Sequence, residues 1–245
     1  MTATKMTTKA SPAKQQSVAV KGYLFVYNAV QVVGWSYILY QLINYYLLQG
    51  QQFRAQVDLW DYTRLAVIVF QNAAFVEILN ASFGLVKSNP VITTFQVLSR
   101  MMVVIGVVMA TPTGKTSPGL PIALLAWAIT EIIRYGYYAL NILNCMPYIV
   151  VFLRYTTFIA LYPIGVTGEL LCFWWAQSYA RTNTVWSAQL PNKWNATFSY
   201  FALLWIVMLL YIPLFPQMYL HMFAQRKKIL GGRGSSKTQE IKKAK

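Results

Sequence analysis

The sequence has few charged residues. Only 11% of its 245 residues are charged, whereas a soluble domain has about 25%, so a soluble fold of this length would lack a polar surface. Hydrophobic residues make up 57% of the chain. This composition excludes a soluble globular enzyme, a disordered regulator and a secreted disulfide scaffold. The sequence therefore predicts an integral membrane protein.

Residues that bind metals or cofactors are also scarce. The chain has two cysteines, Cys145 and Cys172, and one histidine, His221. Their spacing matches no metal site. The chain also lacks the glycine motifs that bind nucleotides and the Cys-x5-Arg loop that binds phosphate. We therefore expect no metal and no cofactor.

Positive charge is concentrated at the two ends. The net charge is +15, and twelve of the basic residues lie in residues 1–21 and 226–245, against one acidic residue. Basic tails beside apolar spans orient a membrane protein and contact anionic headgroups. This distribution favours membrane lipid as a partner and argues against nucleic acid. The final Lys242-Lys243-Ala-Lys245 resembles the dilysine retrieval signal of the endoplasmic reticulum.

The rest of the chain contains six apolar stretches, each long enough to cross a membrane. They lie at about 22–48, 65–86, 91–111, 121–145, 155–177 and 197–223. With six spans both termini lie on one side, and that side holds fourteen Lys and Arg residues against five on the other. Basic residues favour the cytosolic side.

The expected fold is therefore all-α, a polytopic bundle of six transmembrane helices with both termini cytosolic. A disordered cytosolic tail, 1–20, precedes the transmembrane domain, 21–225, and a basic cytosolic tail, 226–245, follows it. Asn195 begins an Asn-Ala-Thr sequence on the lumenal side, where it is a candidate for glycosylation.

Ionisable residues within the spans need an explanation, because each costs about 2.5–3.5 kcal/mol at the bilayer centre. They are Glu77, Arg100, Glu131, Arg134 and Glu169. The first four lie at similar depths and are expected to meet in one layer. Glu131 and Arg134 are three residues apart and face each other on one helix; Glu77 is within reach of Arg100. Such pairs suit a structural role as well as an active site.

Glu169 differs because two arginines among three glutamates leave it without a fixed partner. A carboxyl in apolar surroundings resists ionisation, which suits a general acid or base near neutral pH. Tyr162 lies seven residues earlier on the same helix face, about 10 Å away along the axis. Pro163, Gly165 and Gly168 interrupt the span, which is typical of a cavity wall. Spacing alone leaves simple packing open for Tyr162.

The segment Leu161-Tyr-Pro-Ile-Gly-Val-Thr-Gly-Glu169 resembles the active-site helix of the 3-hydroxyacyl-CoA dehydratases, once called protein-tyrosine-phosphatase-like proteins. The resemblance covers about residues 21–225. Further matching motifs are Tyr23-Leu-Phe-Val-Tyr-Asn28, Glu77-Ile-Leu, Gln96-Val-Leu-Ser-Arg100 and Glu131-Ile-Ile-Arg134. One departure is Asn80-Ala81, where many members have His; this position is outside the Tyr/Glu pair.

The resemblance implies loss of water from a 3-hydroxyacyl-CoA to give a trans-2-enoyl-CoA, in very-long-chain fatty-acid elongation at the endoplasmic reticulum membrane. It implies that Tyr162 and Glu169 are catalytic, with Glu169 the better base. The implied supporting set is Glu77, Gln96, Arg100, Glu131, Arg134, Arg154 and Gly165. Lys87 and Arg154 are the candidates for binding the CoA phosphates.

The implied partners are the other elongation enzymes: elongase, 3-ketoacyl-CoA reductase and trans-2-enoyl-CoA reductase. Two alternatives stay open. A small proton-coupled transporter would use the intramembrane carboxyls as a relay, and an inactive scaffold would only hold the other enzymes together. A dehydration assay on purified protein separates these three hypotheses.

Overall fold

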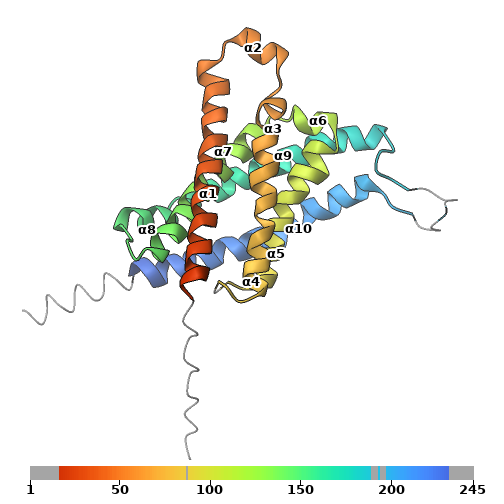
Figure 1. Cartoon of the computed structure of the whole chain (residues 1–245). Helices are drawn as coiled ribbons and strands as arrows, with labels where there is room; N and C mark the ends of the chain where they lie inside the picture. The colour runs from red at the N-terminus through yellow and green to blue at the C-terminus, as the bar shows by residue number, and fades with distance from the viewer. Residues whose placement is uncertain (1–16, 87, 189–192, 194–196, 232–245) are drawn as a thin grey trace, which may run out of the picture.

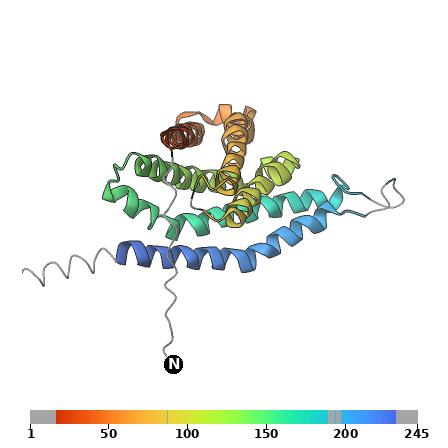
Figure 2. The ribbon, with the colours of Figure 1, turned by 60° about the horizontal axis from the view of Figure 1, so that its bottom comes forward.

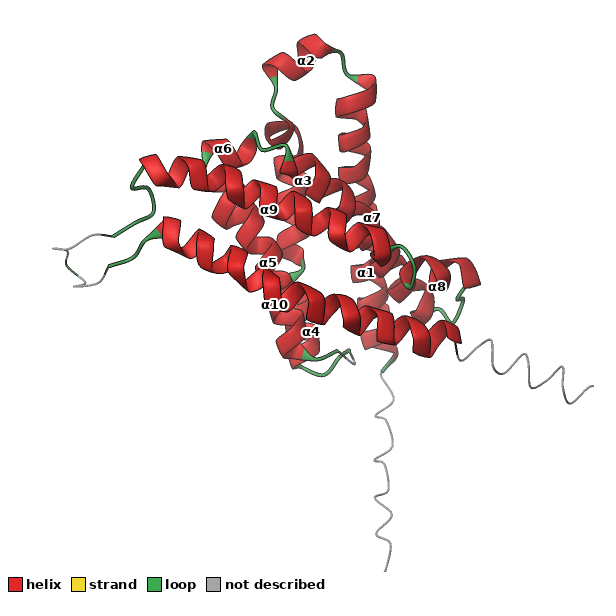
Figure 3. Cartoon of the chain, turned by 180° about the vertical axis from the view of Figure 1, so that it is seen from behind, coloured by secondary structure: helices red, strands yellow, loops and turns green. Residues whose placement is uncertain are grey.

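The computed structural model describes residues 17–86, 88–188, 193 and 197–231, which are almost entirely helical (Figure 1). The helices are α1 Val18–Ile43, η1 Asn44–Leu48, α2 Gln51–Gln56, α3 Leu59–Ala73, α4 Phe75–Ser82, α5 Pro90–Val103, η2 Val104–Met109, α6 Pro112–Lys115, α7 Gly119–Ile142, α8 Tyr148–Arg154, α9 Phe158–Thr182, α10 Tyr200–Arg226 and η3 Lys227–Gly231. The η segments are π-helical continuations. The described residues contain no strand (Figure 3), only a bridge between Ala188 and Phe198.

The long helices form layers around α7. Figure 2 shows α1, α7, α9 and α10 as successive layers, with α7 packed between α1 and α9. Helix α3 packs beside α1, and α4 packs against α5. The central helix is the more buried one: α7 has ten buried residues, whereas α10 at the edge has two, Tyr200 and Leu204. The core therefore lies along α7, and α10 forms an outer wall.

The surface of the bundle is apolar, whereas several polar residues are buried. Helix α1 buries Asn28, Gln31 and Gln41 and exposes Val26 and Val33. This arrangement suits a helix whose outer face meets lipid and whose inner face satisfies its polar groups within the protein.

Four helical segments are long and apolar enough to cross a membrane. They are Leu59–Ser82, Pro90–Met109, Phe158–Thr182 and Tyr200–Gly231. Helices α1 and α7 are of comparable length but are not among these four segments; α1 carries Asn and Gln residues, and α7 carries Glu131 and Arg134. Length and composition thus support a multi-pass membrane protein.

Side-chain caps define several helix starts. The hydroxyl of Ser17 accepts from the Val20 amide at 3.3 Å at the start of α1. At the start of α10, Ser199 accepts from the Ala202 amide at 3.2 Å. Helix α5 begins with Asn89 as the cap, followed by a proline at its first position. Each cap satisfies an amide that has no partner within the helix.

A break separates α3 from α4 at Ala74, although the sequence there has neither proline nor glycine. The Ala74 amide donates three residues back, at 3.2 Å, instead of four. Two α1 side chains bind carbonyls at the break: the Tyr27 hydroxyl donates to Ala73 at 3.1 Å, and the Gln31 amide donates to Phe70 at 3.4 Å. Helix α1 therefore stabilises the break and thereby helps to orient α4.

Helices α7 and α9 cross in backbone contact. A Cβ atom on Gly168 would lie 2.5 Å from the Ala123 nitrogen and 2.8 Å from the Gly119 carbonyl oxygen. A Cβ atom on Gly165 would lie 3.4 Å from the Cβ atom of Ala126. These glycines thus allow the two helices to pack closely.

Helix α9 runs without interruption through Pro163, contrary to the interrupted span predicted from the sequence. Proline cannot donate to the carbonyl four residues earlier, which is that of Ile159. The Tyr219 hydroxyl of α10 donates to this carbonyl at 2.9 Å. A neighbouring helix thus satisfies the group that the proline leaves free, and α9 stays regular.

We predict that Gly168→Ala destabilises the protein by about 1–3 kcal/mol, since the new methyl group would overlap with the backbone of α7. The matched control is Gly136→Ala on α7, where a Cβ atom meets nothing within 4 Å. This control should be neutral or stabilising by up to about 1 kcal/mol. Thermal unfolding of the purified protein in detergent measures both, and equal midpoints would contradict the close contact.

Candidate active site

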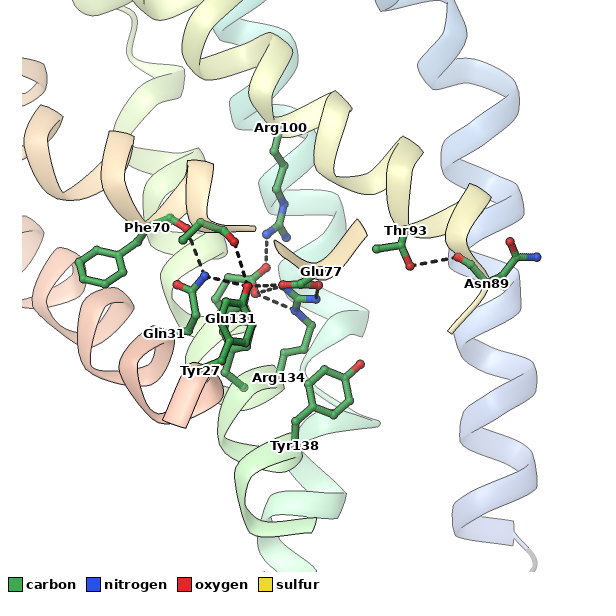
Figure 4. A network of polar contacts seen from close by, with 12 residues as sticks. Tyr27, Gln31, Phe70, Glu77, Asn89, Thr93, Arg100, Glu131, Arg134 and Tyr138 are labelled. Atoms are coloured by element: carbon green, nitrogen blue, oxygen red, sulfur yellow. Dashed lines mark hydrogen bonds and ion pairs between the residues drawn. The ribbon is translucent and has the colours of Figure 1, made fainter. Parts of the chain in front are cut away.

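Arg134 joins two carboxylates at the centre of a buried network (Figure 4). Its two terminal nitrogens donate to the two oxygens of Glu77 at 2.6 and 2.8 Å. Its Nε atom donates to Glu131, three residues earlier on α7, at 2.7 Å. The predicted Glu131–Arg134 pair is therefore confirmed, and Glu77 joins it from α4.

Arg100 completes the network from α5. Its Nη1 atom donates to the second oxygen of Glu131, whose side chain is 1% exposed. The expectation that Glu77 pairs with Arg100 is thus wrong: Glu77 pairs with Arg134, and Arg100 with Glu131. The expectation that these four residues meet in one layer is confirmed.

Two tyrosines adjoin the network, and the sequence reasoning missed both of them. The Tyr135 hydroxyl donates to Glu77. The Tyr27 ring of α1 meets the Tyr135 ring edge-on, with centroids 6.0 Å apart. Gln31, one turn along α1, donates to the Tyr27 hydroxyl at 3.1 Å. The same α1 side chains that bind the α3–α4 break therefore lie next to the group that holds Glu77.

Glu169 lies in a second, differently built polar site. One of its oxygens accepts from the Trp127 indole of α7 at 2.7 Å, and the other accepts from the Tyr211 hydroxyl of α10 at 2.6 Å. The carboxyl is buried, and no ion pair reaches it from the described residues. The expectation that Glu169 lacks a fixed charged partner is confirmed, but two neutral donors hold it.

Tyr162 lies two turns before Glu169 on α9 and is half-buried. Its ring packs edge-on against Phe158, with centroids 5.8 Å apart. Its hydroxyl has no hydrogen bond to any residue that the structure describes. Arg100 and Arg134 both act electrostatically on this hydroxyl. Tyr162 therefore offers a free O–H group near the cationic side of the network.

Arg100 connects the two polar sites. Its guanidinium carbon lies 5.7 Å from the centre of the Trp127 ring, whose indole nitrogen binds Glu169. It also acts electrostatically on the Glu169 carboxyl and the Tyr162 hydroxyl. Arginine has five N–H donors, and Nη1 is the one that binds a described residue. Donors therefore remain for a further polar group beside Trp127.

The described residues contain no group of three or more His, Cys, Asp or Glu residues that could hold a metal ion. The two sites hold a buried carboxyl, and the residues near them include an arginine with unused donors and a phenol whose hydroxyl binds no described residue; such groups can transfer protons and donate hydrogen bonds.

Comparison with known proteins identifies the family. The sequence model described as protein tyrosine phosphatase-like protein, PTPLA, matches residues 71–232. The chain belongs to the PTPLA family. A mouse very-long-chain (3R)-3-hydroxyacyl-CoA dehydratase 2 is 42% identical over 90% of this chain and 84% of its own length. A Caenorhabditis elegans very-long-chain (3R)-3-hydroxyacyl-CoA dehydratase is 40% identical over 91% of this chain and 100% of its own length. No solved structure gives a significant match.

The remaining candidates of this PTPLA protein lie on α5, α8 and α9. Gln96 is on the exposed face of α5, and its backbone carbonyl accepts from the Ser99 hydroxyl at 3.0 Å. Gly165 lies at the α7–α9 crossing. Arg154 ends α8 and packs over the rings of Tyr137 and Tyr138, at 4.5 and 4.7 Å.

Three further positions singled out by the sequence are Lys87, Asn195 and Asn80. Lys87 and Asn195 lie outside the described residues. Asn80, where the sequence departs from many members of the family, is buried and accepts from the Tyr23 hydroxyl at 3.2 Å. This asparagine therefore forms a contact between α1 and α4, away from Tyr162 and Glu169.

We predict that Arg134→Met destabilises the protein by about 3–5 kcal/mol, because it leaves the Glu77 carboxylate without its cation and Glu131 with only one of its two. The matched control is Arg64→Met, which removes an exposed pair with Asp61 at 3.5 Å and should cost at most about 1 kcal/mol. Yield and thermal unfolding in detergent measure the difference. Equal stability of the two variants would show that Arg134 does not hold the helices together.

Proposed function

We propose that this protein removes water from very-long-chain 3-hydroxyacyl-CoA to give trans-2-enoyl-CoA in fatty-acid elongation. Membership of the PTPLA family supports this proposal, as do relatives named very-long-chain (3R)-3-hydroxyacyl-CoA dehydratase that match over most of the chain. The observation that carries it is the setting of Glu169: a buried carboxyl without a cationic partner, on the same helix as a tyrosine with a free hydroxyl.

The reaction needs a base at C2 and an acid at C3. Glu169 takes the C2 proton, and the electrons of that C–H bond form the C2–C3 double bond. The C3–O bond breaks, and the leaving hydroxyl takes a proton from Tyr162 and departs as water. Return of the proton from Glu169 to the Tyr162 phenolate, directly or through solvent, resets the site. Each such proton transfer contributes about 10²–10⁴-fold to the rate. The opposite assignment of acid and base uses the same two residues.

Arg100 has a proposed role in this scheme in addition to its ion pair with Glu131. Removal of the C2 proton moves negative charge onto the thioester oxygen, and preorganised donors aimed at such charge stabilise the transition state. The Arg100 guanidinium lies beside the Trp127 ring, whose indole binds Glu169, and its unused N–H groups are therefore the proposed donors to this charge. Arg134, Glu131 and Glu77 bind one another, so their role is to hold Arg100 and the surrounding helices in place.

The CoA moiety needs cations at the membrane surface. Arg154 is suited to this because no described carboxylate pairs with it; its Nη2 atom donates instead to the Tyr138 hydroxyl at 3.0 Å. Its Nε atom is buried without a partner. We propose that Arg154, together with Lys87, binds CoA phosphates, while the apolar acyl chain lies among the helices.

The proposed topology has six membrane-spanning helices and cytosolic termini. The start of α1 lies at the same end of the bundle as α4 and α8, opposite α2 and α6 (Figure 1). This arrangement, the fourteen-to-five distribution of basic residues and the Lys242-Lys243 signal support a multi-pass protein of the endoplasmic reticulum membrane. Elongase, 3-ketoacyl-CoA reductase and trans-2-enoyl-CoA reductase are the proposed partners, because the first reductase supplies this substrate, the second consumes this product, and the elongase belongs to the same cycle.

We predict that Tyr162→Phe lowers the rate of 3-hydroxyacyl-CoA dehydration by about 10²–10⁴-fold, since it removes the proton donor and little volume. Glu169→Gln keeps the shape, removes the basic carboxylate and should lower the rate as much or more. The double variant should lose far less than the product of the two single losses, because both residues act on one substrate. Purified protein and a chromatographic assay of enoyl-CoA give these rates.

The control is Tyr219→Phe on α10. This change removes a tyrosine hydroxyl that donates to the Ile159 carbonyl, near the start of α9, the helix that carries Tyr162 and Glu169. It should keep its activity once folded. Substrate binding should persist in all the variants, because Arg100 and the apolar walls are intact. Near-normal dehydration by folded Tyr162→Phe or Glu169→Gln would refute the mechanism.

We predict that tags at both termini are digested by protease added to sealed microsomes, because both ends face the cytosol. A tag inserted between α2 and α3, in the loop after Val57, should be protected until detergent opens the vesicles. Protection of either terminal tag would contradict the six-helix topology.

A further inference from the structure

The Glu169 carboxyl has a built environment that the dehydration scheme above does not use. Its oxygens accept one hydrogen bond each, from Trp127 on α7 and Tyr211 on α10. Both donors are neutral, and both distances lie in the range of bonds to an ionised acceptor. The side chain is therefore held between two helices other than its own.

We infer that Trp127 and Tyr211 are positioning residues that keep the Glu169 carboxylate ionised and aimed at the C2 proton. This inference rests on the proposed role of Glu169 as the base. Each oxygen of a carboxylate has a second acceptor site, so both oxygens keep a lone pair for a proton from the substrate. A carboxylate with one bond on each oxygen cannot rotate without losing both of them.

Trp127 also links the two polar sites. It lies one turn before Glu131 on α7, and its ring lies beside the Arg100 guanidinium, which binds Glu131. The indole thus contacts a cation with its face and a carboxylate with its N–H group. A shift of Arg100 therefore changes the position of the group that holds Glu169.

Tyr211 is one of three α10 tyrosines whose hydroxyls bind the rest of the protein. Tyr200 donates to the backbone carbonyl of Gly106, and Tyr219 donates to that of Ile159. Tyr211 alone among the three donates to a carboxylate, and its ring packs edge-on against Phe173, with centroids 6.1 Å apart. The first two contacts dock α10, whereas the third sets the orientation of an acid–base group.

Tyr200→Phe is therefore a matched control for Tyr211→Phe, since each change removes one tyrosine hydroxyl from α10. Tyr211→Phe should lower kcat for a very-long-chain 3-hydroxyacyl-CoA by about 10- to 100-fold, the contribution expected from one hydrogen bond to a charged group. KM should change by less than about threefold, because no substrate contact is lost. Tyr200→Phe should keep kcat and lower only the stability.

A pH profile separates positioning from stability. Removal of a donor disfavours the ionised carboxylate, so the acid limb of the kcat/KM profile should move to higher pH in Tyr211→Phe and in Trp127→Phe. The other ionisable groups that act on Glu169 or Tyr211 are Arg100 of α5 and Cys172 of α9. Both are unchanged in these variants, so the limb should stay in place in Tyr200→Phe.

In a Glu169→Gln background, Tyr211→Phe should add little further loss, because a positioning residue acts through the group it positions. One outcome contradicts the inference alone: Glu169→Gln is inactive, but folded Tyr211→Phe and Trp127→Phe have the same kcat and pH profile as the control Tyr200→Phe. The inference is then wrong, and the proposed function stands. If Glu169→Gln keeps its activity, both are wrong. A loss in Tyr211→Phe that persists undiminished in the Glu169→Gln background also overturns the inference, because Tyr211 would then act on the substrate independently of Glu169.

Discussion

A charge among apolar helices has to be compensated within the protein, and Arg134 does this for two carboxylates at once. It binds Glu77 with two nitrogens and Glu131 with a third. Because Glu131 also binds Arg100, the network joins the three helices that carry these residues, α4, α5 and α7. The break between α3 and α4 belongs to the same arrangement, since the α1 side chains that bind it lie beside the network.

The protein contains two kinds of buried carboxyl. Glu77 and Glu131 are bound by arginines, and such pairs are costly to disrupt because each partner alone would be an uncompensated charge. Glu169 is bound by an indole and a phenol. Neutral donors stabilise an ionised carboxylate less than a guanidinium does, so Glu169 remains able to take up and release a proton. This difference in environment suits Glu77 and Glu131 to a structural role and Glu169 to acid–base chemistry.

The sequence predicted where the long helices lie and how deep their charged residues are, because both depend on position along the chain. It did not predict which side chains face each other, because that depends on how each helix is rotated about its axis. Apolar length placed the long helices: the stretch at 155–177, for example, corresponds to α9. Depth brought the four charged residues into one layer, but it could not show which of them face each other, and the Glu77–Arg100 pair was wrong for that reason. The break at Ala74 was missed because neither proline nor glycine marks it.

The donors to Glu169 were missed for a similar reason. Helix α10 is apolar on all sides, so nothing in its sequence distinguishes Tyr211 from the other 16 tyrosines of the chain. Trp127 had one available signal, its position four residues before Glu131 on the same helix face. A tryptophan at that spacing is usually taken for packing, and its N–H group becomes informative only when a carboxyl from another helix is known to lie beside it.

The backbone contact between α7 and α9 limits how this fold can vary. At Gly119 and Gly168 there is no side chain to shorten, and any side chain that is added meets backbone. The spacing of the two helices that carry Trp127 and Glu169 is therefore at its minimum and cannot be tuned by substitution. A deeper or shallower space for an acyl chain has to come from the looser walls, above all α10, which buries few of its residues and whose positions apart from Tyr211 can change without losing a contact to the carboxyl.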